Sequence, residues 1–143
     1  MKNSMIALLT IATLTMVSCK KDKEETQAVT KENISGTYKL GSVKGQVSGG
    51  AEQDVTSALF ESCELDNATT LKTDLTYTVV DAGTQCSPAT DESGTWGLSG
   101  TTGFVLDGES FTIKSWNGSQ LVLTQTDNSG GVTATYTTTL NKQ

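Results

Sequence analysis

From residue 36 onward, the chain is a series of short segments rich in Thr, Val, Gly and aromatic residues, separated by turn signals and holding a single proline, Pro88. Closely spaced segments of this composition are typical of β-strands that follow one another directly along the chain. They fit an all-β protein, a small antiparallel meander barrel of about eight strands. The predicted strands are residues 36–43, 64–72, 75–82, 93–98, 102–106, 109–115, 119–126 and 132–140.

Turn-forming residues support this sequential order. Asp107-Gly108 and Asn117-Gly118 each stand between apolar segments, and residues 127–131 (DNSGG) precede the last predicted strand. Such residues favour tight hairpin turns, so consecutive strands should be antiparallel neighbours. A three-residue loop with Gly118 in the left-handed region would pair Ile113 with Leu121 and bury the apolar face of that hairpin.

Cys63 and Cys86 flank the hairpin that is predicted over residues 64–82. A turn at Asp74-Leu75 would place the two cysteines opposite each other, where a disulfide would clamp the open end of the hairpin. Two free thiols are the alternative interpretation, although no basic residue lies close by in sequence to activate a thiolate.

Between the first two predicted strands, residues 54–63 (DVTSALFESC) predict one short helix. Asp54 could cap this helix, and Val55, Ala58 and Leu59 would fall on one side of it. A helix at this place could cover one end of the barrel. A well-packed loop is the alternative.

The charge and the missing residue types exclude whole classes of function. The formal net charge is −6, which disfavours nucleic acid as a partner. The chain contains no His and its basic residues are all lysines, so the commonest general base, the commonest metal ligand and the bidentate anion clamp are missing. Paired carboxylates remain as the one enzymatic option, for instance Asp91-Glu92 with Asp107 and Glu109. Because acids in glycine-bounded loops are usually solvated, we expect a protein that is not an enzyme, with no catalytic residue, metal or cofactor.

The N-terminal segment has the features of a secretion signal. It begins with a single charge, Lys2, continues as an apolar run from Met5 to Val17, and has small residues before Cys19. The run is too short to span a membrane as a helix. The segment resembles a bacterial lipoprotein signal, in which a peptidase cuts directly before the cysteine. The resemblance implies that residues 1–18 are removed and that Cys19 carries acyl chains, palmitate among them.

Residues 19–33 are rich in Lys, Glu, Gln and Thr and contain few apolar residues, so we expect a flexible charged tether. The lipoprotein resemblance implies that the N-terminal lipid anchors the protein in the bacterial outer membrane. The run CKKDKEE that opens the tether resembles signals that send some lipoproteins to the cell surface. A plain solvated spacer is the alternative interpretation of this run.

Five short stretches carry a resemblance in the barrel region: residues 34–40 (ISGTYKL), 63–67 (CELDN), 74–78 (DLTYT), 94–96 (GTW) and 121–123 (LVL). As a set they resemble the lipocalin-like domain of secreted bacterial lipoproteins, over most of residues 34–140. The resemblance implies a lipocalin-like barrel at residues 34–143 with a general binding role rather than a defined reaction.

The resemblance also draws attention to the start of the first strand. Lipocalins place a tryptophan there in a Gly-x-Trp pattern, often covered by a basic residue from the last strand. This chain has Tyr38 in that position. Because the chain lacks arginine, the covering contact is either absent or made by a lysine such as Lys142.

Alternate positions on the predicted strands should point into the barrel. If the barrel is hollow, aromatic side chains among them would supply stacking surfaces and polar groups for a small ligand. If it is filled, the same side chains simply form the core. The predicted interior residues are Leu40, Ile113, Leu121 and Leu123, together with the candidate ligand-binding residues Tyr38, Tyr77, Trp96, Phe104, Phe111 and Tyr136.

Two functions follow from these observations. The first is a monomeric, lipid-anchored barrel that binds a small apolar or amphipathic molecule without transforming it. The second is a filled barrel that recognises a protein or a glycan through its loops, notably residues 45–53 and 84–91. The volume of the barrel interior distinguishes them, because only the first requires a cavity of a few hundred cubic ångströms.

Overall fold

The computed structural model of this chain describes residues 27–143. Three predictions fall on residues outside that range: the signal at residues 1–18, the lipidation of Cys19, and most of the tether at residues 19–33.

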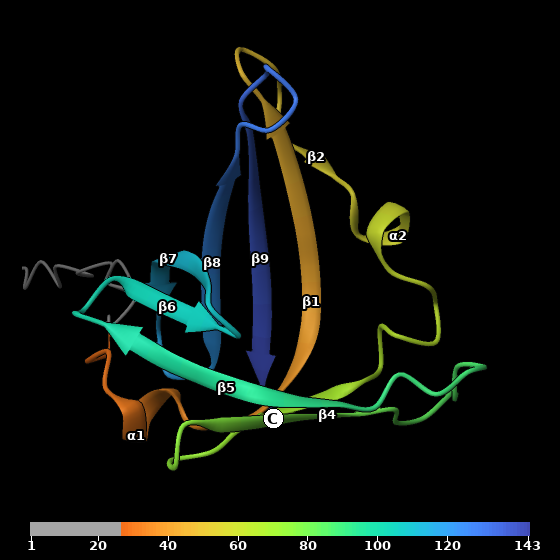
Figure 1. The fold of residues 1–143 in the computed structure, drawn as a ribbon, viewed down its shortest axis with the longest axis vertical. Helices are drawn as coiled ribbons and strands as arrows, with labels where there is room; N and C mark the ends of the chain where they lie inside the picture. Colours follow the sequence, from red (N-terminus) through yellow and green to blue (C-terminus); the bar gives the residue numbers. More distant parts are fainter. Residues whose placement is uncertain (1–26) are drawn as a thin grey trace, which may run out of the picture.

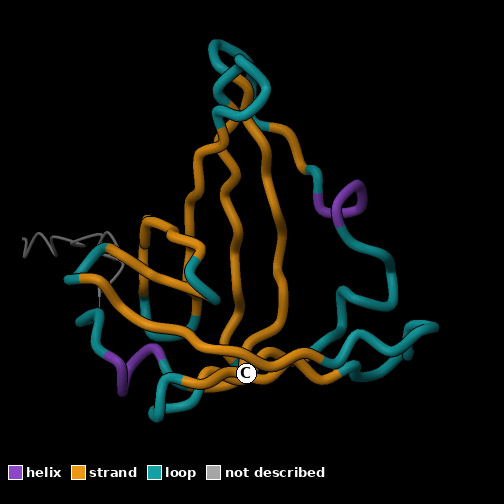
Figure 2. The backbone as a smooth tube through the Cα atoms, in the orientation of Figure 1, coloured by secondary structure: helices purple, strands orange, loops and turns teal. Residues whose placement is uncertain are grey.

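The described part of the chain contains nine strands and two four-residue helices (Figure 1). Strands account for most of the backbone, and the two helices lie at its periphery (Figure 2). In chain order the elements are α1 (Lys31–Ile34), β1 (Gly36–Val47), β2 (Gln53–Asp54), α2 (Thr56–Leu59), β3 (Ala68–Leu71), β4 (Thr76–Val80), β5 (Glu92–Ser99), β6 (Gly103–Leu106), β7 (Glu109–Trp116), β8 (Gln120–Asp127) and β9 (Ala134–Lys142).

The strands form an antiparallel meander that closes into a barrel. From β3 to β9 each strand pairs with its neighbour in sequence, and β1 pairs with β3 on one edge and with β9 on the other. Eight strands therefore make the closed ring, and the two-residue β2 is an addition on the edge of β1. The predicted all-β, eight-stranded meander barrel is confirmed.

Strand β1 serves two parts of the structure because it is long and bends. Its pairing with β9 shifts register between Leu40 and Ser42, which leaves Gly41 as a bulge. Residues before the bulge pair with β3, whereas Lys44 and Gly45, beyond it, pair with β2. A bulge of this kind increases the local bend and twist of a strand, as barrel closure requires. In Figure 1, β1 rises with β8 and β9 well above the level of β4 and β5.

The composition of residues 27–33 predicts part of a flexible tether, whereas the structure holds these residues against the barrel. The Gln27 N–H donates to the Trp116 carbonyl over 3.2 Å, and the Thr30 hydroxyl accepts from the Asn33 N–H as the N-cap of α1. Ile34, which ends α1, is fully buried, and Val29 packs against the core. These two apolar side chains supply the burial that the composition as a whole does not suggest. Helix α1 is an addition to the one short helix that the sequence predicts.

The helix predicted over residues 54–63 forms only the single turn α2. Asp54 lies one residue before the N-cap, and its Oδ1 accepts from the Thr56 N–H at 2.9 Å. The Thr56 hydroxyl is also within hydrogen-bond distance of the Val43 backbone N–H, which fastens the turn to β1. No residue of α2 is buried, so the helix lies beside β1 (Figure 1) and does not fill a barrel end.

The predicted register of the β7–β8 hairpin is wrong. Ile113 pairs with Leu123 rather than with Leu121, and Trp116 takes the place opposite Leu121. The cause is a bulge at Lys114, which lets two residues of β7 oppose one of β8 and reverses the inside–outside alternation beyond it. Trp116 therefore points inward and is only 2% exposed, although the sequence predicts that its strand ends before it.

The β3–β4 hairpin also differs from its predicted register by one residue, because Leu71 pairs with Tyr77. Leu75 takes the left-handed position of the connecting loop, with φ of 69°. The predicted disulfide between Cys63 and Cys86 is nevertheless confirmed, with the two Cα atoms 5.3 Å apart. The bridge lies beyond the paired residues of the hairpin, so it joins two loops rather than two strands.

The base of the barrel is a packed layer organised by Lys142. Its ammonium nitrogen lies 5.9 Å from the ring centre of Tyr38 and 5.3 Å from that of Trp116, and it donates to the Asn33 carbonyl over 2.7 Å. The contact that covers Tyr38 is therefore present and is made by Lys142, which is one of the two alternatives that the sequence left open. Gly36 makes room for the lysine, since a Cβ at this residue would collide with Lys142 Cε.

Lys142→Met tests the charge at the base, because methionine retains an apolar stem but loses the ammonium group. We expect a loss of about 1–3 kcal/mol in the free energy of unfolding, from two cation–π contacts and a charged hydrogen bond. Urea denaturation measures it. Lys114→Met is the matched control, since Lys114 is exposed on β7; equal losses in the two variants would contradict this role for Lys142.

Candidate ligand-binding site

Above the packed base the barrel interior holds a cavity of about 360 Å³ that is open on one side. The residues that line it come from β1, from β3–β9, from the connection between α2 and β3, and from the connection between β4 and β5. Leu71, Phe104 and Leu123 form its buried floor, next to the base. The remaining apolar wall is Leu40, Phe60, Val79, Leu106, Phe111 and Leu140, and the polar lining is Glu64, Asn67, Thr69, Thr90, Glu92 and Thr138.

Two of the six candidate ligand-binding residues, Phe104 and Phe111, line the cavity. Their rings meet edge to face, with centroids 6.3 Å apart. The ring of Trp96 stacks on that of Phe104, with centroids 5.9 Å apart. This aromatic cluster gives the lower part of the cavity a rigid apolar surface.

The structure does not place Tyr38, Tyr77, Trp96 or Tyr136 in the lining. The first three are buried, and their polar atoms are already bound: Tyr38 to the Ile34 carbonyl, Trp96 to the Lys72 carbonyl and Tyr77 to Asp107. Tyr136 pairs with Gly45, in the part of β1 that extends beyond the bulge. Alternation along a strand predicts which face a side chain occupies, but it does not predict its depth along the barrel axis.

The Tyr77 hydroxyl donates to Asp107 Oδ2 over 2.6 Å, and the Thr95 N–H donates to Oδ1 of the same carboxylate. The hydrogen bond to Asp107, followed by burial, raises the pKa of Tyr77 to about 12. The same bond holds the pKa of Asp107 below its usual range. A general acid for glycoside cleavage needs a raised pKa, so this geometry argues against Asp107 in that role. Asp91 is engaged structurally, as acceptor for the Asp81 N–H at 2.8 Å.

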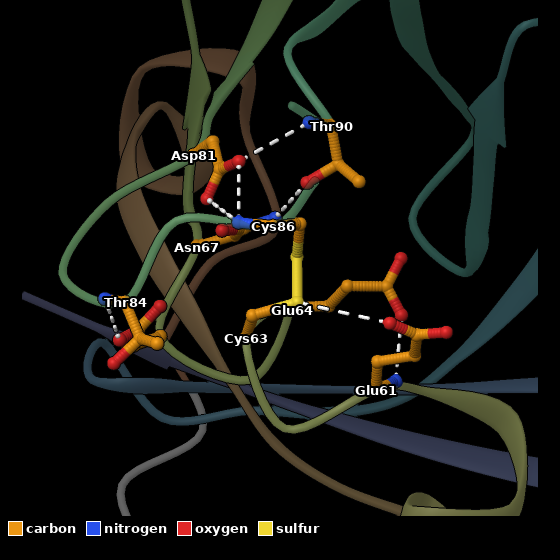
Figure 3. The surroundings of a disulfide bond; sticks show 9 residues. Glu61, Cys63, Glu64, Asn67, Asp81, Thr84, Cys86 and Thr90 are labelled. Atoms are coloured by element: carbon orange, nitrogen blue, oxygen red, sulfur yellow. Dashed lines mark hydrogen bonds between the residues drawn. A yellow bond between two sulfur atoms is a disulfide. The ribbon is translucent and has the colours of Figure 1, made fainter. Parts of the chain in front are cut away.

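The loop of residues 81–91 is organised by the buried carboxylate of Asp81. It accepts from the Cys86 N–H at 3.0 Å and from the Thr90 N–H at 3.2 Å (Figure 3). Satisfying two backbone donors with one carboxylate fixes a loop that has no strand partner of its own. Asp81 thereby sets the position of Thr90 in the cavity wall.

The disulfide joins this loop to the segment that carries Glu64 and Asn67 (Figure 3). A hydrogen bond of 2.9 Å from Asn67 Nδ2 to the Thr90 hydroxyl links the same two segments inside the cavity wall. Asn67 Oδ1, by contrast, is buried and has no hydrogen-bond partner among residues 27–143.

The sequence analysis did not identify Glu64, Asn67 and Thr90 as lining residues, and it considered Glu92 only as one of a pair of catalytic carboxylates. The first two fall near the start of a predicted strand and the others in a predicted loop or at its end. The available signal was the cysteine pair, because a bridge between residues 63 and 86 necessarily brings the adjoining residues together.

Two further findings concern the described residues. Among residues 27–143, no three cysteine or carboxylate side chains are grouped as a metal ion would require. Within the same range, no helix has the length and apolar character needed to cross a membrane.

Comparison with known proteins gives one match. The family model described as a lipocalin-like domain matches residues 34–142, which is most of the chain and the whole of the closed barrel. No curated protein and no solved structure matches the sequence.

Reduction of the Cys63–Cys86 bridge tests how far the cavity wall depends on it. We expect the free energy of unfolding to fall by about 2–4 kcal/mol, because the bridge restricts the unfolded chain. Thermal denaturation with and without reductant measures the effect. The double variant Cys63→Ser, Cys86→Ser is the control and should not respond to reductant; an unchanged melting curve of the native protein on reduction would contradict the prediction.

Proposed function

We propose that this chain, which belongs to the family of lipocalin-like domains, binds a small apolar or amphipathic molecule in its barrel and does not transform it. The observation that carries the proposal is the cavity of about 360 Å³ above the packed base. This volume falls within the range of about 300–1,000 Å³ typical of small-molecule sites.

The character of the wall supports a binding role. Nine of the fifteen lining residues are Leu, Val or Phe, and the polar ones are few. Such a wall removes apolar surface from water while a small number of polar groups orient the ligand. The binding of ligands, rather than catalysis, is also typical of the lipocalin-like family.

The alternative, a filled barrel that recognises partners through its loops, is less well supported. It needs a packed interior, whereas the interior is packed only at the base. It also draws on exposed loop aromatics, and Trp116, the aromatic nearest to such a position in the sequence, is buried.

Lipid anchoring at Cys19 belongs to the same proposal. The described chain begins at Gln27, which is bonded to Trp116 at the base of the barrel. Residues 19–26 can span at most about 3.5 Å each. A lipid on Cys19 would therefore hold the base near the outer membrane and leave the cavity, at the other end, accessible to ligand. Several acyl chains on one cysteine supply far more membrane affinity than a single chain does.

Cys19→Ala tests the anchor. Cells that express this variant should incorporate no labelled palmitate into the protein, because the modified thiol is gone, and the protein should leave the membrane fraction. Ser18→Ala keeps both the cysteine and a small residue before it, so it should be labelled like the native chain. Labelling of the Cys19→Ala protein would overturn the anchoring proposal.

Thr138→Phe tests the cavity. Thr138 lines it, whereas the next residue of β9, Thr139, does not. We expect the added ring to reduce the affinity for a probe such as octanol by about tenfold or more, because it occupies the ligand's volume. Isothermal titration calorimetry measures this affinity.

Thr139→Phe is the matched control and should bind octanol like the native protein. Circular dichroism establishes that both variants are folded. Native mass spectrometry of the protein from its own host adds a direct readout, since a bound small molecule should travel with the native chain and the control but not with Thr138→Phe. Equal octanol affinity in all three proteins would refute the cavity as the binding site.

A further inference from the structure

We propose that the ligand is an amphiphile whose polar end is a protonated amine, held by Glu64 and Glu92 while its apolar body lies against Phe104 and Phe111. This inference rests on the proposed function and specifies the class of ligand that the cavity takes.

The polar groups of the cavity lie predominantly on one side of it. Thr69 on β3 pairs with Val79 on β4, and Val79 pairs with Glu92 on β5, so the three residues form a row across neighbouring strands. Asn67 and Thr90, which are hydrogen-bonded to each other, extend this row toward the disulfide (Figure 3). The floor and the opposite wall are mainly apolar. A ligand with one polar end and one apolar end matches this division.

The charge of the lining distinguishes an amine from other donors. Two carboxylates, Glu64 and Glu92, belong to the lining, and no lysine does. Among residues 27–143 the ion pairs are Lys31–Glu32 and Lys44–Glu52, so neither lining glutamate is neutralised by a lysine there. Glu64 Oε2 accepts from the Glu61 N–H at 2.7 Å, which holds its carboxylate in place.

This electrostatic environment disfavours the ligand that an apolar barrel would otherwise accept most readily, a fatty acid. Its carboxylate would meet the two like charges of Glu64 and Glu92. An ammonium group brings three donors and the complementary charge. The net charge of −6 favours the approach of the cation as well.

Three probes with the same chain and different polar ends test the inference: octylamine, octanol and octanoate. With the native protein, calorimetry near neutral pH should give an affinity for octylamine about tenfold higher than for octanol, because hydrogen bonds to charged groups are the stronger ones. Octanoate should bind most weakly. Added salt should weaken the binding of octylamine more than that of octanol.

Variants assign the preference to particular residues. Glu64→Gln and Glu92→Gln should each lower the affinity for octylamine by about three- to tenfold and leave octanol nearly unchanged. Glu32→Gln, on α1 at the base, makes the same change in net charge and should have no effect.

The outcomes separate this inference from the proposed function. If octanol and octanoate bind as well as octylamine or better, or if Glu32→Gln reduces octylamine binding as much as the two lining variants do, the amine preference is refuted and the binding function stands. If none of the three probes binds, the proposed function fails and the inference fails with it.

Discussion

Closure of the sheet by the pairing of β1 with β9 is the contact on which the rest of the structure depends. It joins the first and last strands of the barrel over nine residue pairs, from Tyr38↔Lys142 to Val47↔Ala134. Without it the meander would be an open sheet with two exposed edges and no interior. The same pairing brings Lys142 over Tyr38 and Trp116, so the strand pair that closes the ring also provides the contacts that fill its base.

The closed ring is then divided along its axis. At the base, large side chains from several strands fill the interior, with Ile34, Tyr38 and Leu121 fully buried. Above Phe104 and Leu123 the inward side chains are mostly aliphatic or small, and they leave a cavity of about 360 Å³. Barrels of eight strands lie at the boundary between filled and hollow interiors, and here one chain shows both conditions. The packed base provides stability, which allows the upper part to stay open for a ligand.

Loops carry part of the polar wall of the cavity. Asp81 fixes the loop of residues 81–91, and the Cys63–Cys86 bridge joins this loop to the segment before β3. These two segments bring Glu64, Asn67 and Thr90 to the wall. The strands contribute most of the apolar surface, together with Thr69, Glu92 and Thr138. Residues carried on loops can change while the barrel stays the same, as in many folds that carry different functions on one scaffold.

By itself, the sequence determined the all-β class, the order of the strands, the cysteine partners and the lysine that could cover Tyr38, because alternation, turn residues and cysteine count are local or compositional signals. The tertiary structure alone decided how deep each inward residue lies, so Phe104 and Phe111 reach the cavity whereas Tyr38, Tyr77 and Trp96 do not. It also decided the bulges at Gly41 and Lys114, the second of which turns Trp116 inward. Depth, bulges and the placement of Asn67 and Thr90 depend on partners far away in sequence, and no local pattern carries that information.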